Sequence, residues 1–365
     1  MRVLTINTTP LKKGGITNVI FNLLENIDKT DLSFDMVVSK TESEDLVDRF
    51  RVHGGEVFFV PRSIKKAVLY IVRVKKIIEE KGYDAVHIHG NSHTVVLELL
   101  AAKLAGCKVR IVHAHSTKCN DLKLHKVLAG FFHKLCTHNI ACGEDAGRFM
   151  FGDKPFTAIN NGISLEKFRF SSDGRDSLKE KYALSKKTVI GHIGMFNDIK
   201  NQDFLLETLT EILKTDQNYV LMLVGDGERR ELISKKAKEM GISDSVIFTG
   251  LTNEVSEHLS LFDVFVLPSF FEGLPLVLVE AQANGLYCIA SDRVTNEADK
   301  TGNISFLSID NGSKVWAEEI LKRADNKNRE ETSKIAIKTL KEKGYSAKGE
   351  AEKLLNYYKT AIFGK

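Results

Sequence analysis

Short apolar runs typical of buried strands alternate with longer segments of helical periodicity along almost the whole chain. Such alternation favours α/β domains, each built on a doubly wound parallel sheet. The pattern restarts after about residue 170, at the polar stretch 171–176, which predicts two domains, 1–170 and 171–350. The runs predicted as strands are 3–7, 34–39, 57–60, 85–89, 109–113, 139–142 and 157–159, then 189–193, 220–224, 246–248, 264–267, 287–290 and 304–307.

Length and composition are those of a globular protein. A chain of 365 residues is long enough for two domains of average size, and 43% apolar with 27% charged residues is an ordinary balance. No apolar run approaches the ~18 residues of a membrane-spanning helix. The N-terminus has too short an apolar part for a signal peptide, and the five cysteines contain no C-x-x-C pair. These features predict a cytoplasmic protein with reduced thiols.

The segment FEGLPLVLVE, which follows a predicted strand, has the clearest signature of a binding site. It predicts a tight turn and then a helix whose first turn is set by Pro275. Backbone N–H groups from Gly273 to Val277 have no partner within such a helix, so a phosphate or diphosphate can accept hydrogen bonds from them. The carboxylates of Glu272 and Glu280 then remain free to hold hydroxyl groups on either side of the phosphate.

This spacing of two glutamates resembles the signature of retaining nucleotide-sugar glycosyltransferases of family 4, which have the GT-B fold. Further segments occur in the family's order along nearly all 365 residues. They are 14–15 (GG), 112–115 (VHAH), 141–144 (ACGE), 160–163 (NNGI), 191–201 and 224–228 (VGDGE). The resemblance is closest to bacterial capsular and exopolysaccharide transferases. It implies two Rossmann-like domains facing across a cleft, with a last helix, about 351–365, packing back on the first domain.

The resemblance implies roles for several residues of the second domain. Glu280 is expected to hold the ribose hydroxyls of a nucleotide, and Glu272 to lie nearer the donor sugar and its diphosphate. Lys200 is expected to neutralise the charge that grows on the leaving diphosphate, so that Lys200 and Glu272 are catalytic. The other donor-binding positions of this turn are Gly273, Leu274, Leu276 and Val277.

One position departs from the family pattern. The family has an arginine beside the catalytic lysine, whereas this chain has Met195, which carries no charge and donates no hydrogen bond. Another cation, such as Arg293 or a residue of the opposite domain, could take its place. The alternatives are a slower site or a degenerate one.

In the first domain the resemblance points to a glycine pair and a histidine. Gly14 and Gly15 lie in the loop after the first strand, where the backbone can approach the donor closely. His115 follows a predicted strand and is expected beside the donor sugar, as a third catalytic residue. His87 and His89 lie on one face of another strand, and three histidines near two strand ends could suggest zinc. No cysteine or carboxylate stands at ligand spacing, D-x-D is absent and the family is metal-independent, so no metal or cofactor is expected.

Basic residues are concentrated in the first domain. Residues 1–170 hold 25 Lys+Arg against 18 Asp+Glu, or +7, and the rest of the chain holds 27 against 30, or −3. Two stretches, 62–81 and 118–134, mix basic and apolar residues. Their apolar side chains either face the core, with the lysines solvated, or dock the protein peripherally on an anionic membrane. No nucleic-acid-binding module is recognisable, so no nucleic-acid partner is expected.

The resulting prediction is a retaining hexosyltransferase. It would move a sugar from a nucleotide-diphosphate donor, a UDP-sugar, to a saccharide or a polyprenyl-diphosphate-linked saccharide in capsular, exopolysaccharide or cell-surface glycan synthesis. The membrane association would be peripheral, at the inner face of the plasma membrane. Two alternatives stay open: a nucleotide-sugar epimerase of the same architecture, and a non-catalytic subunit that binds nucleotide sugars.

Overall fold

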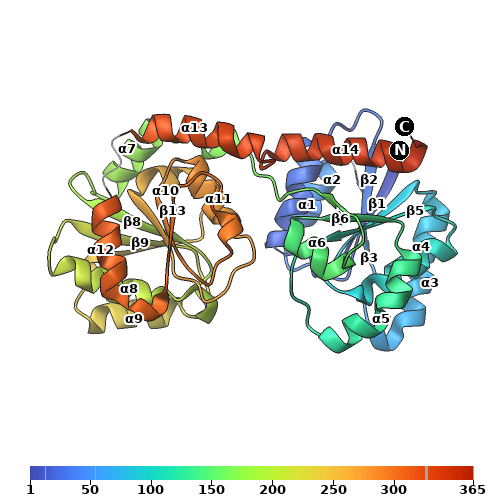
Figure 1. The fold of residues 1–365 in the computed structure, drawn as a ribbon, viewed down its shortest axis with the longest axis horizontal. Coiled ribbons are helices and arrows are strands. Elements are labelled where there is room, and N and C mark those ends of the chain that lie inside the picture. Colours follow the sequence, from blue (N-terminus) through green and yellow to red (C-terminus); the bar gives the residue numbers. More distant parts are fainter. Residues whose placement is uncertain (13, 54, 325–327, 365) are drawn as a thin grey trace. The chain divides into compact units, whose positions relative to one another are not determined.

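The computed structural model describes residues 1–12, 14–53, 55–324 and 328–364 (Figure 1). These residues form two compact units. Unit 1 comprises Met1–Gly162 together with the C-terminal segment from Gly344, and unit 2 comprises Ile163–Lys343. Each unit is an α/β domain built on a single parallel sheet.

The sheet of unit 1 has seven strands in the order β3-β2-β1-β4-β5-β6-β7. Asn7, His89 and His113 stand side by side in the register of β1, β4 and β5, so the carboxyl ends of these central strands are level. The strands are β1 (Arg2–Asn7), β2 (Ser33–Val38), β3 (Val57–Phe59), β4 (Ala85–His89), β5 (Val109–Ala114), β6 (His138–Ala141) and β7 (Thr157–Ala158).

Helices cover both faces of this sheet, as the near-continuous apolar strands require. One buried core contains side chains of α1, α2 and α14. The opposite core contains side chains of α3, α4, α5 and α6. The helices are α1 (Gly15–Asn26), α2 (Glu44–Val52), α3 (Ala67–Lys81), α4 (Val96–Leu104), α5 (Leu122–Leu135), α6 (Glu144–Phe151) and α14 (Ala347–Phe363).

The last helix, α14, packs on α1 (Figure 1). Its Leu354 and Tyr358 are buried in the same core as α1. The segment NNGI, residues 160–163, lies against the start of this helix. A side chain at Gly162 would lie 2.8 Å from the backbone of Ala347, at the start of α14. A glycine is therefore needed at this position for the helix to dock.

The sheet of unit 2 has six parallel strands in the order β10-β9-β8-β11-β12-β13. α8, α9 and α12 share one core, while α11 packs on α13 and α10 on α7. The strands are β8 (Thr188–Ile193), β9 (Tyr219–Val224), β10 (Val246–Gly250), β11 (Val264–Leu267), β12 (Cys288–Ser291) and β13 (Ile304–Leu307). The helices are α7 (Ser172–Lys181), α8 (Gln202–Leu213), α9 (Arg230–Glu239), α10 (Val255–Leu261), α11 (Leu276–Ala283), α12 (Ser313–Arg323) and α13 (Arg329–Glu342).

Every run predicted as a strand is a strand, with ends shifted by small amounts. The predicted linker 171–176 is wrong, because Ser171 caps α7 by accepting a hydrogen bond from the Gly174 N–H, and the helix begins at once. The unit boundary also lies earlier than residue 170. Asn284 donates to the carbonyl of Phe168 and Ser333 accepts from the Phe170 N–H, so these residues belong to unit 2.

The five cysteines are free thiols. Among the described residues, none of the helices has both the length and the apolar character needed to span a bilayer.

Candidate functional site

The two predicted catalytic residues of unit 2 are in contact. Glu272 lies in the turn between β11 and α11, and the Lys200 Nζ atom is 2.5 Å from its Oε1 atom. Each side chain is only 17% exposed, so the pair is screened less than a surface pair. α11 begins at Leu276 with Pro275 as its N-cap, and no side chain caps it. The amides of its first turn therefore remain available to an anion.

Local hydrogen bonds fix the position of Lys200. It ends a short 3₁₀ turn, Asp198–Lys200, whose N-cap Asn197 accepts from the Lys200 backbone N–H. The same 3₁₀ turn is tied to the Glu272 turn, because the Phe270 N–H donates to the Ile199 carbonyl at 2.8 Å. The lysine stem lies close to Gly194, where an added Cβ would be 3.3 Å from Cδ and Cε.

The segment VGDGE packs its backbone against the loop that leads to Lys200. The Phe196 N–H donates to the Asp226 carbonyl, and the Gly194 N–H donates to the Val224 carbonyl. Gly225 has φ +134°, and an added Cβ there would lie 2.1 Å from the Gly194 carbonyl oxygen. Only glycine can occupy this position without moving the loop.

An arginine that the sequence analysis did not single out clamps the same loop. Arg229 forms ion pairs with Asp198, in the turn that ends at Lys200, and with Asp203, at 2.6 Å. Its backbone N–H also donates to the Phe196 carbonyl. No sequence signal separates this arginine from Arg230 beside it, because the distinction depends on which side chain reaches back across the loop.

Glu280 lies in α11, on the helix that follows the Glu272 turn. Burial raises the pKa of its carboxyl to about 7 from an ordinary 4.5, and the nearby charge of Lys167 lowers it only in part. The group is thus poised between its neutral and ionised forms near neutral pH. Ribose hydroxyls donating to it would favour the carboxylate. Lys167 is a second residue that the sequence analysis missed.

Met195 stands where the family has an arginine, and its side chain is 59% exposed. The backbone of this residue is held in place, because Gln202 donates to the Met195 carbonyl at 3.0 Å. The proposed substitute, Arg293, pairs instead with the exposed carboxylate of Asp310 at 3.0 Å and stacks over Phe270. The structure therefore gives Arg293 other partners.

In unit 1, Gly14 is the N-cap of α1 and Gly15 its first residue. Gly14 has φ 168°, an extended conformation open to any residue. An added Cβ would meet nothing within 4 Å at Gly15 and only the Lys12 carbonyl, at 4.0 Å, at Gly14. Neither backbone conformation nor internal packing explains the glycine pair. Open space around both positions is what a closely approaching ligand would need.

His115 lies just beyond β5 and belongs to a stack of four histidines on β4 and β5. Its Nε2 atom is 2.8 Å from His89 Nδ1, and the His87 Nδ1 atom is 2.5 Å from the hydroxyl of Tyr358. Burial lowers the pKa of His87 and His115 to about 3, and those of His89 and His113 well below the ordinary value. These imidazoles are therefore neutral near pH 7.

The ring nitrogens of His87, His89 and His113 lie within 4.8 Å of one another. The His87 ring is stacked on that of His89, with centroids 4.3 Å apart, and on that of His113, with centroids 5.4 Å apart, while the His89 and His113 rings are tilted by 35°. Stacked rings direct their in-plane lone pairs side by side rather than toward one centre, whereas a zinc site needs converging ligands. We therefore assign no metal to this group.

The comparisons with known proteins agree with this geometry. The family model described as Glycosyltransferase Family 4 matches residues 13–167, and that described as Glycosyl transferases group 1 matches residues 174–339. A Bacillus subtilis (strain 168) protein named glycosyltransferase EpsF is 34% identical over 367 residues, covering 95% of this chain and 94% of that protein. An Escherichia coli protein named UDP-Gal:alpha-D-GlcNAc-diphosphoundecaprenol alpha-1,3-galactosyltransferase is 32% identical, covering 80% of this chain and 79% of that protein.

Among solved structures, Anabaena HepE in complex with UDP matches with a TM-score of 0.80 at 15% identity, covering 99% of this chain and 100% of that chain. This match shows the fold, while the sequence matches show the family. The chain belongs to the family 4 glycosyltransferases and has the GT-B fold.

Proposed function

We propose that this glycosyltransferase moves a hexose from a UDP-sugar to a lipid-linked saccharide, with retention of configuration, in capsular or exopolysaccharide synthesis. The observation that carries the proposal is the half-buried Lys200–Glu272 pair at the uncapped start of α11, on the same helix as Glu280. Free backbone amides and a cation can bind a diphosphate, and two carboxylates can accept hydrogen bonds from the hydroxyls of a sugar and a ribose. The name of the Escherichia coli relative gives UDP-Gal as donor and a diphosphoundecaprenol-linked sugar as acceptor.

The chemistry assigned to unit 2 is electrostatic. The bond between the anomeric carbon and the diphosphate oxygen breaks, and a bond forms between that carbon and the acceptor hydroxyl oxygen. The acceptor proton passes to the departing phosphate oxygen, so no separate base is needed. Lys200 and the amides at Gly273, Leu274, Leu276 and Val277 stabilise the charge that grows on the diphosphate.

Glu272 has two roles in this proposal. It holds the Lys200 ammonium in place through their contact, and it accepts a hydrogen bond from a hydroxyl of the donor sugar. Glu280 holds the ribose hydroxyls as a carboxylate. In unit 1, we assign the sugar contact to His115, whose neutral ring can donate or accept but does not repel a cationic transition state. Gly14 and Gly15 let the donor approach the backbone.

The donor can be identified by thermal unfolding of the full-length protein with UDP-, GDP-, ADP- and TDP-sugars, in the presence of a chelator. We expect a UDP-sugar to raise the unfolding midpoint, because a ligand that binds only the folded state stabilises it. The same UDP-sugar should then label an undecaprenyl-diphosphate-linked saccharide. A rise with another nucleotide alone, or a dependence on added metal, would contradict the proposed donor and mechanism.

A product assay separates this proposal from its alternatives. Binding of the UDP-sugar without transfer to lipid-linked or free saccharides would favour a non-catalytic subunit. Such a subunit would fit the exposed Met195, which stands in place of the family's arginine. Conversion of the UDP-sugar to its epimer in the absence of any acceptor would favour an epimerase.

A further inference from the structure

Three loops of unit 2 present an aromatic ring, an arginine and a carboxylate at one edge of the sheet. β11, β12 and β13 are neighbours in the sheet, and Phe270, Arg293 and Asp310 follow closely after their carboxyl ends. Ligands of parallel sheets bind at this edge. Glu272 lies two residues beyond Phe270, so these side chains stand beside the proposed donor site.

Backbone contacts hold the loops of Phe270 and Arg293 against the Glu272 turn. The Phe270 N–H donates to the Ile199 carbonyl, in the 3₁₀ turn that ends at the proposed catalytic lysine. Glu272 forms an isolated parallel bridge with Val294, the residue directly after Arg293. Both side chains are therefore carried by backbone that is tied to the turn of the proposed catalytic pair.

The three side chains contact one another. The guanidinium carbon of Arg293 lies 5.6 Å from the centroid of the Phe270 ring, a cation–π arrangement. Its Nη2 atom donates to both carboxylate oxygens of Asp310, each at 3.0 Å. A ring, a cation and an anion are thus combined in one cluster. We call these three residues the loop platform.

The loop platform is open to solvent. Phe270 is 44% exposed, and the side chains of Arg293 and Asp310 are 41% and 75% exposed. An exposed ion pair contributes little to stability, so folding alone gives it no clear role. In the described part of the chain, the guanidinium donates only from Nη2, and only to Asp310. Its Nε and Nη1 donors therefore remain available to a ligand.

This combination of groups matches a sugar ring. A pyranose presents C–H bonds on one face, which pack on an aromatic ring, and its vicinal hydroxyls both donate and accept hydrogen bonds. Arg293 supplies donors in a fixed planar geometry, and Asp310 supplies acceptors beside them. A phosphate group is a poorer occupant, because the carboxylate would repel it.

We propose that the loop platform binds a sugar of the acceptor saccharide. The sugar stacks on Phe270, while its hydroxyls accept from Arg293 and donate to Asp310. The donor has groups of its own, since Glu272 is assigned to its sugar and Glu280 to its ribose. The inference rests on the proposed transfer reaction and deepens it, because it gives unit 2 a part in recognising the acceptor.

Saccharide binding can be measured without turnover by saturation-transfer NMR of the full-length protein in the presence of UDP. The probes are the methyl glycosides of glucose, galactose and N-acetylglucosamine. Phe270→Leu removes the flat ring but keeps an apolar side chain, and it should weaken glycoside binding about tenfold. Phe270→Tyr keeps the ring and should bind within about twofold of the wild type. Asp310→Asn should weaken binding about fivefold, since a hydrogen bond to a charged group is lost.

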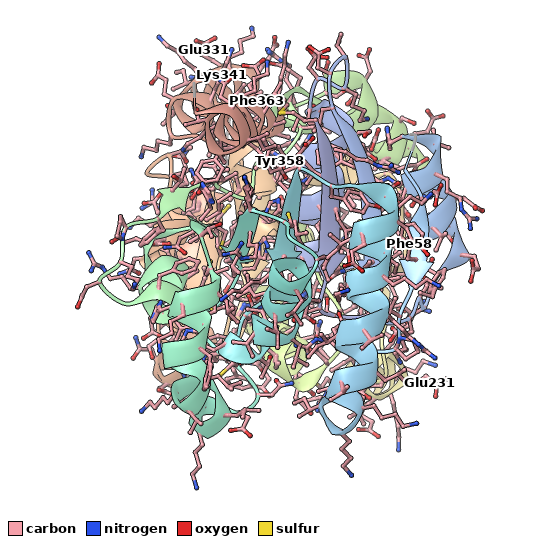
Figure 2. The ribbon with its side chains drawn as sticks, turned by 90° about the vertical axis from the view of Figure 1, so that its right-hand side faces the viewer. Phe58, Glu231, Glu331, Lys341, Tyr358 and Phe363 are labelled. Carbon is pink, nitrogen blue, oxygen red and sulfur yellow. The ribbon has the colours of Figure 1, made fainter. Side chains whose placement is uncertain are left out.

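A matched control lies in unit 1, where Phe58, labelled in Figure 2, is part of β3. The Lys81 Nζ atom lies 5.8 Å from the centroid of the Phe58 ring and pairs with Glu56 at 2.8 Å. This cluster has the same three kinds of group but lies outside the candidate site. Phe58→Leu and Glu56→Gln should therefore leave glycoside binding unchanged.

Equal glycoside binding by wild type and Phe270→Leu would overturn the inference, and so would the absence of binding to the wild type. A loss in Phe270→Tyr as large as that in Phe270→Leu would show a packing role and also overturn it. UDP alone should raise the unfolding midpoint equally in wild type and Phe270→Leu. A smaller rise in the variant would assign the ring to the nucleobase. A failure of the proposed transfer reaction is visible separately, as the absence of any midpoint rise with nucleotide sugars.

Discussion

Replacing Glu280 with glutamine tests the buried carboxyl of the proposed donor site without any ligand. Burial raises the pKa of this group to about 7, whereas the unfolded chain has the ordinary value of 4.5. Between these two values the unfolded chain carries Glu280 ionised and the folded protein carries it protonated. The folded state binds the extra proton, so the free energy of unfolding falls as the pH rises through this window.

The size of the effect follows from the shift. The contribution of Glu280 to the free energy of unfolding is fully present below about pH 4.5 and is lost above about pH 7. The total loss across this window is about 3 kcal/mol. Glutamine is similar in shape and does not titrate. The variant should therefore match the wild type near about pH 4.5 and exceed it by about 2–3 kcal/mol near about pH 8. The buried histidines titrate alike in both proteins, so they cancel in the difference.

Urea unfolding followed by tryptophan fluorescence is the suitable assay. Trp316 is the only tryptophan of the chain and is fully buried against Phe204 in unit 2, the unit that contains Glu280. Glu239→Gln, at an exposed position of α9, is the matched control and should show no such difference. Differences between wild type and Glu280→Gln that stay constant across the pH range would refute the reasoning. With UDP added, the stabilised variant should bind more weakly, a split that a packing residue would not show.

Four further substitutions test the rest of the site. Lys200→Met should lower turnover at least tenfold, since a charge-assisted contact is worth about 1.5–3 kcal/mol. Glu272→Ala should also lower turnover. If both variants fold and turn over at nearly the wild-type rate, the catalytic assignment of this pair is wrong. Gly225→Ala should lower the free energy of unfolding, measured in urea, by about 3 kcal/mol. The control Gly241→Ala should lower it by about 1 kcal/mol, because a Cβ added there meets nothing within 4 Å. Equal losses of unfolding free energy in the two variants would contradict the close approach of Gly225 to the Gly194 loop. Met195→Arg should raise turnover without changing the unfolding midpoint, because the side chain is exposed; unchanged turnover would show that no cation is lacking.

The strands and the long helices could be predicted because their signals are local. Helix α3 is one example, since its apolar side chains recur at helical spacing and Gly82, directly after Lys81, ends it. The unit boundary could not be predicted in the same way. Phe168 joins unit 2 through a hydrogen bond from Asn284, more than a hundred residues later. Nothing in the polar stretch after residue 170 encodes that contact.

Some features of the candidate site could likewise be predicted from the sequence, and others could not. The contact of Lys200 with Glu272 spans 72 residues, and only the resemblance to a family placed both in one site. The clamp by Arg229 and the charge of Lys167 near Glu280 were missed, because each depends on how separate loops meet. The exposed apolar stripes of α3 and α5 were seen as patterns, but the sequence left open whether they faced the core. That question is decided by Tyr70 and Phe132, which occupy the core instead.

Backbone contacts, and not the side chain at position 195, hold the loop in which Met195 departs from the family pattern. The loop that positions Lys200 is held by main-chain hydrogen bonds at Gly194 and Phe196, and by a close approach that requires glycine at Gly225. None of these interactions involves the Met195 side chain, which is exposed. Replacing an arginine there removes a charge but no contact that shapes the loop. We therefore expect an arginine at this position to serve catalysis and not the shape of the loop, which can keep its geometry while the number of cations at the proposed diphosphate site changes.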